Sequence, residues 1–287
     1  MSSLSKVANP GASLSAIQFH YDIGNDFYHL WLDNTKTYTC ALWGDATTLE
    51  QAQINKLDYH IDQARAADKA VVLDIGCGWG PALRRMVEHR NVGRAIGLTL
   101  SQAQADYVAS LGDDRIRVKV ESWSDHEPTE PYDAIISIGA FEHFARPDTS
   151  HEEKLDGYRE FFERCRRWLK PGGYLSLQTI TFQNSDRKDL NPFILKEIWP
   201  ETDLPRLSDI TIASDRKLEI VQARNDREDY VRTCQAWVHY IEENEDRAAA
   251  LVGMDVVQRY KHWFKLSMIG FRTGTMGLFR ITFKRST

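Results

Sequence analysis

The sequence has few cysteines, and none of them is arranged as a metal site or a disulfide framework would require. No C-x-x-C pair occurs, and no histidine cluster has metal-ligand spacing. We therefore predict neither a metal ion nor disulfide bonds, and we expect a reducing, cytoplasmic location. The four cysteines are Cys40, Cys77, Cys165 and Cys234.

Long apolar runs and a basic excess are also missing. No run reaches the ~18 apolar residues that a membrane span needs, and residues 1–12 lack the apolar core of a signal peptide. The 36 Lys and Arg against 41 Asp and Glu give a net charge of -5, which argues against a nucleic-acid partner. With 287 residues, 42% of them hydrophobic, and no repeats, the chain is expected to form a single domain over residues 1–287.

Short apolar runs alternate with helical stretches in the middle of the chain. The runs predict buried strands at residues 70–73, 95–98, 116–120, 134–138 and 175–180. The intervening stretches predict helices at residues 81–89, 102–111 and 155–169. This alternation is typical of right-handed βαβ units, so the fold class expected is α/β with a Rossmann-like, doubly wound sheet.

Three further segments flank this α/β pattern. Residues from about 13 to 68 are predicted to form an N-terminal helical cap, with helices over 17–32 and from about 49, where Thr47 and Thr48 are cap candidates. Residues from about 184 to 212 mix proline, apolar and charged residues and are predicted to be a lid insertion over the site. Residues 270–284 alternate in polarity and are predicted to form a closing β-hairpin.

A glycine-rich loop, Asp74-Ile75-Gly76-Cys77-Gly78-Trp79-Gly80, follows the first predicted strand and precedes a helix. That position places the glycines at the ligand-binding edge of an open α/β sheet, where a side chain would block close approach to the backbone. The third glycine falls one residue too early for the dinucleotide pattern G-x-G-x-x-G. The pattern D-x-G-x-G-x-G instead resembles the first motif of class I methyltransferases, which bind S-adenosylmethionine (SAM).

The second predicted strand lacks the acidic residue with which many Rossmann-like proteins hold a ribose. It ends in Gly97-Leu98-Thr99-Leu100-Ser101, so Thr99 and Gln104 are the candidate polar contacts. Ser122 and Trp123 follow the third strand, where the indole can contact an adenine ring.

Several longer motifs resemble the cyclopropane fatty acid synthase family, especially the mycolic acid cyclopropane synthases. They lie at residues 21–28, 37–41, 74–80, 97–101 and 137–144, the last reading Ser-Ile-Gly-Ala-Phe-Glu-His-Phe. The resemblance implies a class I methyltransferase fold that binds SAM. The candidate SAM-binding residues from the motifs and the resemblance are Tyr38, Thr39, Asp74, Gly76, Gly78, Gly80, Thr99, Leu100, Gln104, Ser122, Trp123 and Ile138.

The resemblance also implies a catalytic site. Cys40, Glu142 and Tyr230 match family positions around a bound bicarbonate, and Ile180 matches a residue whose carbonyl joins that site. The family's bicarbonate-binding histidine is replaced by Gln178, whose neutral amide holds an anion less well. This difference argues against bicarbonate as a bound group.

The remaining candidates follow from the chemistry of methyl transfer to carbon. Such a transfer leaves a carbocation, which the Glu142 carboxylate can stabilise or deprotonate. His143 is a candidate second base, although a histidine in a helix is more often structural. Several aromatic residues, including Trp199, Trp237, Trp263, Phe264 and Phe271, are candidates to line an apolar acceptor pocket.

These features predict a SAM-dependent C-methyltransferase that acts on a small or medium hydrophobic acceptor, such as an alkene, an isoprenoid or an aromatic carbon, in secondary metabolism. Two differences from the family favour this hypothesis: Gln178 replaces the family histidine, and the lid segment is shorter and more polar than the family's. The alternatives are a cyclopropane synthase or methyltransferase of unsaturated acyl chains, an N-methyltransferase of an alkaloid-like amine, and a SAM-binding protein without activity. The sequence does not predict the oligomeric state.

Overall fold

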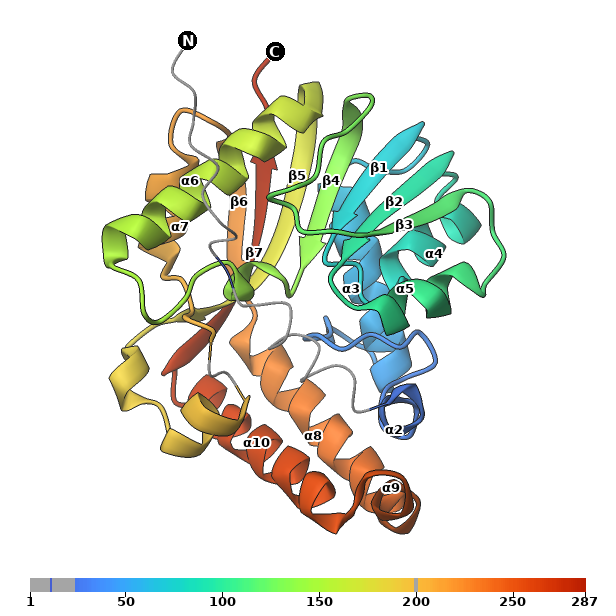
Figure 1. Cartoon of the computed structure of the whole chain (residues 1–287), viewed down its shortest axis with the longest axis vertical. Coiled ribbons are helices and arrows are strands. Elements are labelled where there is room, and N and C mark those ends of the chain that lie inside the picture. Colours follow the sequence, from blue (N-terminus) through green and yellow to red (C-terminus); the bar gives the residue numbers. More distant parts are fainter. Residues whose placement is uncertain (1–10, 12–23, 199–200) are drawn as a thin grey trace.

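A seven-stranded mixed sheet organises the chain, in the order β3-β2-β1-β4-β5-β7-β6 (Figure 1). The computed structural model describes residue 11, residues 24–198 and residues 201–287. Strands β1 to β5 are parallel, and β7 is antiparallel to both β5 and β6. The strands are β1 (Val71–Ile75), β2 (Arg94–Thr99), β3 (Ile116–Val120), β4 (Tyr132–Ile138), β5 (Leu169–Phe182), β6 (Glu219–Asn225) and β7 (Met276–Lys284).

Strand order reverses between β1 and β4, which pair in register through Val72 and Ala134. In an open α/β sheet, the crevice at such a reversal is where ligands bind. The loops that follow β1 and β4 carry the glycine motif and Glu142, so the topology brings these two motifs to one edge. The expected doubly wound α/β class is confirmed.

Helices cover both faces of the sheet and one of its ends (Figure 1). Apolar residues of α3 and α4 pack on one face, and those of α6 and α7 pack on the other. Helices α8, α9 and α10 lie together beyond the end of the sheet. The helices are α2 (Asn25–His29), α3 (Leu49–Gln63), α4 (Pro81–His89), α5 (Gln102–Ala109), α6 (His151–Trp168), α7 (Leu207–Ser214), α8 (Arg227–Glu243), α9 (Glu245–Val252) and α10 (Met254–Arg272).

Local capping chemistry sets the starts of several helices. Thr48 accepts a hydrogen bond from the backbone N–H of Gln51, which confirms it as the cap of α3. Ser150 and Glu153 form a reciprocal capping box, so α6 begins before the expected residue 155. Of the first predicted helix, residues 17–23 lie outside the described part of the chain, and the rest contributes α2.

The predicted C-terminal hairpin is wrong. Residues before Thr273 belong to α10, and only β7 follows, inserted between β5 and β6. Its alternating pattern reflects a strand with long-range partners, such as Ile180 opposite Leu278. Strand β6 was not predicted, because this edge strand is mostly exposed and has no apolar run.

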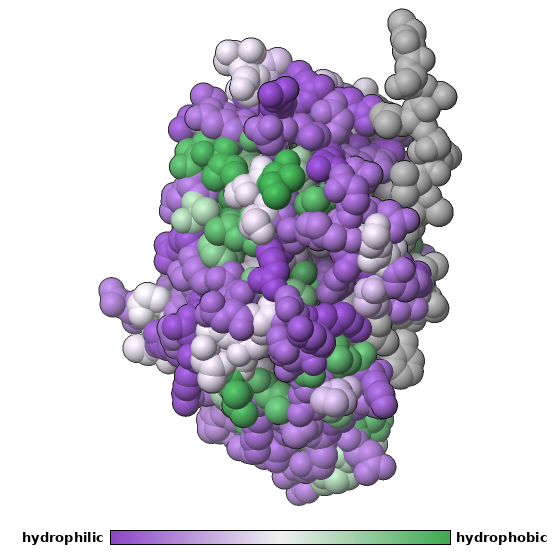
Figure 2. Space-filling model, turned by 90° about the vertical axis from the view of Figure 1, so that its left-hand side faces the viewer, coloured by the Kyte–Doolittle hydropathy of each residue, from purple (hydrophilic) through white to green (hydrophobic). Residues whose placement is uncertain are grey.

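The predicted lid, residues 184–212, contains a 3-10 turn at Arg187–Asp189, a π-helical turn at Ile194–Ile198 and the start of α7. Its buried side chains Leu190, Ile194, Ile198 and Leu204 join the cluster formed by α8 and α10. Ile210, at the start of α7, packs instead with α6 against the sheet. Figure 2 shows the side of the molecule that carries α6 and α7, which is mostly hydrophilic with separate apolar patches. Within the described residues, no helix is both long and apolar enough to cross a membrane.

Candidate functional site

The glycine loop after β1 bends sharply and leaves open space beside it. Gly76 has a φ of +83°, and a Cβ there would lie 2.5 Å from the Cβ of Ala140. Gly78 has a φ of +55°, and a Cβ there would meet no atom within 4 Å, because it would point into a cavity. The loop therefore keeps backbone accessible to a ligand at the sheet edge.

A large cavity, of about 1070 Å³, lies over this loop. Of the candidate SAM-binding residues, only Gly80 does not line this cavity. A Cβ at Gly80 would lie 2.9 Å from Val108 Cγ2, so this glycine allows the loop to pack closely on α5. The sequence-derived candidates that do line the cavity are Tyr38, Thr39, Asp74, Gly76, Gly78, Thr99, Leu100, Gln104, Ser122, Trp123 and Ile138.

The ends of β2 and β3 supply polar and aromatic walls for this cavity. Thr99 Oγ1 donates to Gln104 Oε1 at 2.7 Å, so the two candidate ribose contacts are already oriented by each other. Trp123 is 4% exposed and packs against Phe144 and Phe161, with ring centroids 5.1 and 5.5 Å away. Its indole thus serves both the core and the cavity wall.

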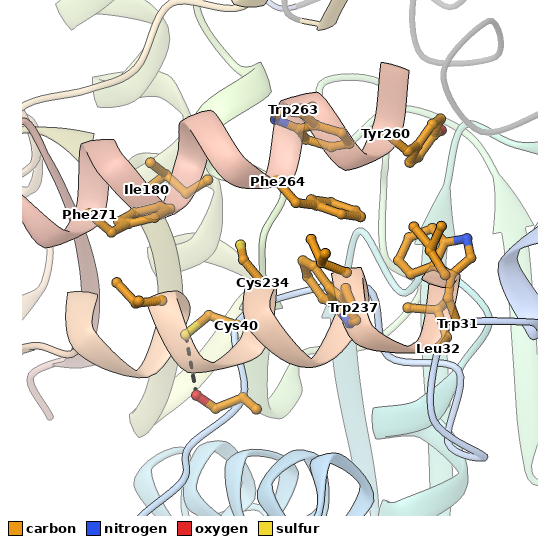
Figure 3. Packing of buried hydrophobic residues seen from close by; sticks show 14 of the residues in the cluster. Trp31, Leu32, Cys40, Ile180, Cys234, Trp237, Tyr260, Trp263, Phe264 and Phe271 are labelled. Atoms are coloured by element: carbon orange, nitrogen blue, oxygen red, sulfur yellow. Dashed lines mark hydrogen bonds between the residues drawn. The ribbon is translucent and has the colours of Figure 1, made fainter. Parts of the chain in front are cut away.

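A second, smaller cavity of about 550 Å³ lies between the sheet edge and helices α8 and α10. Figure 3 shows Trp237, Phe264 and Phe271 in the space between these helices. Trp199 lies outside the described residues, and no described residue of the lid lines either cavity. The lining of the second cavity is Tyr38, Thr39, Gly139, Glu142, His143, Ile180, Tyr230, Cys234, Trp237, Trp263, Phe264, Ser267 and Phe271.

The two cavities share a boundary. Tyr38, Thr39, Gly139 and His143 line both of them. Gly139 permits this contact, because a Cβ at its φ of +72° would lie 2.4 Å from Thr39 Cγ2. A ligand in the first cavity and one in the second would therefore meet at this boundary.

Glu142 provides a buried carboxyl group in the second cavity. It follows β4 in a 3-10 turn, Phe141–His143, and is 6% exposed. Burial raises the pKa of Glu142 to about 7, while hydrogen bonds lower it in part. One of these bonds comes from Thr179 Oγ1, which donates to Glu142 Oε2 at 3.1 Å. A carboxyl group with this pKa can accept a proton near neutral pH.

His143 and Tyr230 lie at the same cavity in different surroundings. His143 lies 3.0 Å from Thr202, measured from Nδ1 to Oγ1, and burial lowers its pKa to about 4. The imidazole is therefore neutral at physiological pH. The Tyr230 ring stacks on Phe271 with centroids 4.4 Å apart, which fixes its orientation in the cavity wall.

Gln178 and Cys40, the other two catalytic candidates, line neither cavity. The side-chain oxygen of Gln178 accepts a hydrogen bond from Arg280 Nε at 2.9 Å and lies 3.3 Å from His60 Nε2. Cys40 is fully buried, and burial raises its thiol pKa to about 12. Its Sγ donates a hydrogen bond to the Ala41 carbonyl, so Cys40 is a structural residue of the packed interior.

Sequence reasoning missed two lysines of the cofactor cavity, Lys36 and Lys56. Lys36 follows Asp33, which binds the backbone of this turn, and no motif marks it. For Lys56 a signal existed. It lies on the buried face of α3 beside Leu57, where an apolar residue is expected. Within the described residues, no group of three or more His, Cys, Asp or Glu is placed to hold a metal ion.

Comparisons with known proteins agree with this geometry. The family model of the mycolic acid cyclopropane synthetases matches residues 9–281. Cyclopropane mycolic acid synthase 3 of Mycobacterium tuberculosis is 34% identical over 288 residues, covering 94% of this chain and 96% of the relative.

Two solved structures resemble the whole fold. The cyclopropane synthase MmaA2 from Mycobacterium tuberculosis superposes with a TM-score of 0.86 at 31% identity, covering 96% of this chain and 100% of the other. The mycolic acid cyclopropane synthase CmaA1, complexed with SAH and CTAB, gives a TM-score of 0.84 at 32% identity, covering 96% and 99%. The chain belongs to the mycolic acid cyclopropane synthase family and is a SAM-dependent methyltransferase.

Proposed function

We propose that this enzyme transfers the methyl group of SAM to a carbon–carbon double bond of an unsaturated acyl chain, with Glu142 as the base. The observation that carries the proposal is the buried Glu142 carboxyl in an aromatic cavity that adjoins the cofactor cavity. The family names and the hydrophobic ligand CTAB in CmaA1 support an acyl acceptor. They favour the alternative of the sequence analysis over its leading hypothesis.

The residues fit the chemistry of alkene methylation. SAM supplies an electrophilic methyl group on a sulfonium. Tyr38, Thr39 and Gly139 line both cavities and can align the double bond with that methyl group. Aromatic faces of Trp237 and Phe264 stabilise the carbocation that forms on the acceptor. Glu142 then takes a proton from the new methyl group as the ring closes, or from an adjacent carbon, which leaves a methylated alkene.

We assign the base to Glu142 alone, without bicarbonate. The Gln178 amide oxygen is already engaged by Arg280, and Cys40 lies outside the cavity. Gln178 replaces the histidine that the resemblance assigns to anion binding, and the imidazole that does line the cavity, that of His143, is neutral at physiological pH. A methyl-transfer rate that depends on added bicarbonate would contradict this assignment.

A labelled cofactor tests the acceptor class. Purified enzyme with SAM carrying a fully deuterated methyl group is offered unsaturated phospholipids and, separately, small alkenes, isoprenoids, indoles and amines. We expect labelled product in the lipid fraction. Loss of one deuterium indicates a cyclopropane, and full retention indicates a methylated chain. Product only among the small molecules would reject the acyl acceptor, and the labelled atom would distinguish C- from N-methylation.

A small hydrophobic acceptor remains the second candidate. The aromatic walls of the second cavity, among them Trp237, Phe264 and Phe271, suit an aromatic or isoprenoid acceptor as well as an acyl chain. The difference at Gln178 adds to that case, because it sets this chain apart from the family pattern. The same labelling experiment separates the two candidates.

The raised pKa of Glu142 predicts the pH dependence of turnover. Its pKa is about 7, so the base form decreases as pH falls below 7. At saturating SAM, we expect kcat to rise about tenfold per pH unit below 7 and to level off above it. Saturating SAM is used because titration of Lys56 and Asp74 could otherwise change the measured rate through the affinity for SAM. A flat kcat profile between pH 5 and 8 would reject Glu142 as the base.

The raised pKa of Glu142 also makes the stability of the folded state depend on pH. Because the folded-state pKa lies above the unfolded value of 4.5, the group favours the folded state below pH 4.5. That contribution is lost as pH rises through about 7.

A further inference from the structure

Helix α3 presents polar side chains to the sheet on a face where apolar ones are expected. Gln53, Lys56 and His60 are each 0 or 1% exposed. Gln53 Nε2 donates to the carbonyls of Thr37 and Thr39, at 3.2 and 2.9 Å. These contacts fix the segment that forms the boundary of the two cavities, but they leave the charge of Lys56 unexplained.

The Lys56 ammonium group lies at the wall of the cofactor cavity. Its Nζ donates to Thr39 Oγ1 at 2.9 Å, and this is the one hydrogen bond that it makes within the described residues. Among the described residues no salt bridge to a carboxylate involves Nζ, although the charges of Asp33 and Asp74 act on it from farther away and raise its pKa in part. Burial lowers the pKa of Lys56 to about 7, which shows how poorly the site solvates the cation. A buried ammonium of this kind gains most from an anionic ligand.

The position of Lys56 selects one end of the cavity. Its partner Thr39 contacts the Gly139 side of the cavity and also lines the acceptor cavity. Thr99 ends β2, Gln104 lies in the first turn of α5, and Trp123 follows β3. In the sheet, β1 separates these strands from β4, which leads to Gly139 at the boundary. Because the transferred methyl group must face the acceptor, the amino-acid part of SAM belongs near Thr39, and the adenosine belongs near Trp123.

The amino-acid part of SAM carries one ammonium and one carboxylate group. Asp74 and Lys56 both line the cavity and are the complementary groups for these two charges. Burial raises the pKa of Asp74 to about 7, while the charge of Lys56 lowers it in part, so each group favours the charged form of the other. Lys36 is the other lysine of the cavity, and its Nζ lies 4.5 Å over the Tyr107 ring of α5. That contact holds Lys36 on the β2–α5 side, where Gln104 also lies.

We propose that Lys56 binds the carboxylate group of SAM and of its product, S-adenosylhomocysteine (SAH). Thr39 orients the ammonium, and Asp74 provides the opposite charge for the ligand's amino group. This inference rests on SAM as the cofactor and does not depend on the identity of the methyl acceptor.

The test is a comparison of ligands with and without the carboxylate. Calorimetry measures the Kd of SAH and of decarboxylated SAH for the wild type, Lys56→Met and the control Lys36→Met. We expect Lys56→Met to weaken SAH binding about 10- to 100-fold and to change that of decarboxylated SAH less than about twofold. Lys36→Met should keep the wild-type ratio of the two Kd values.

Two results would overturn the proposal. Equal weakening of both ligands by Lys56→Met would mean that Lys56 acts only by holding Thr39. A wild type that binds the two ligands equally well would reject carboxylate recognition without any variant, so the test stands even if Lys56→Met does not fold. Neither measurement uses a methyl acceptor, so failure of the acyl-chain proposal would leave both results unchanged.

Discussion

Glu142→Gln is expected to lower kcat about 10²- to 10⁴-fold, the range that loss of a general base produces. The amide has nearly the same shape and can still accept from Thr179 Oγ1, but it cannot take up the proton or carry negative charge. The affinity for SAH should change less than about twofold, because Glu142 does not line the cofactor cavity. Single-turnover rates with SAM and calorimetry with SAH measure the two effects separately.

A matched variant controls for loss of any carboxylate. Glu163→Gln removes a surface carboxylate of α6 that pairs with Arg166, and it should leave kcat unchanged. If Glu142→Gln kept more than about a tenth of the wild-type kcat, Glu142 would not be the base. Loss of SAH binding in Glu142→Gln would instead point to a structural defect.

Arg280→Met is expected to lower the free energy of unfolding by about 3 to 5 kcal/mol. The Arg280 side chain is fully buried and pairs with Asp226. Its guanidinium also donates to Gln178 Oε1 and to the carbonyls of Cys40 and Ala41. Methionine fills much of the volume but leaves these buried acceptors without their donor.

Arg224→Met is the matched control, because Arg224 also pairs with Asp226 but is 40% exposed. We expect its effect to stay below about 1 kcal/mol. Urea denaturation followed by circular dichroism gives both values. Equal losses for the two variants would show that burial of Arg280 adds nothing to the ion pair.

The buried strands of the sheet were predictable from local sequence. Strands β1, β2 and β4 lie where apolar runs predict them, because a strand buried on both faces needs such a run. Strand β3 also lies at its predicted residues, but the expectation that it is buried was wrong, because it forms an edge of the sheet and is mostly exposed. Strand β6 escaped prediction because the sheet edge leaves it exposed. Strand β7 was placed correctly, but its partners were not, because β5 lies about a hundred residues earlier in the chain.

The cofactor cavity was more predictable than the acceptor site. The glycines after β1 require positive φ angles and open space, and the sequence marks both requirements locally. The fate of Gln178 depends instead on Arg280, which is 102 residues away. No local pattern shows that this arginine turns inward and holds the amide, so the sequence placed Gln178 among the catalytic candidates.

The sequence by itself determined the α/β class, the family and the SAM-binding loop, since periodicity and glycine positions act over a few residues. Only the tertiary structure decided which polar side chains face a cavity. In the folded chain, the side chain of Glu142 faces an aromatic pocket and that of Lys56 faces the cofactor cavity. Gln178 and Cys40 lie instead in the packed interior. The physical reason is that burial, and with it the pKa and the available partners of a side chain, depends on segments brought together from distant parts of the chain.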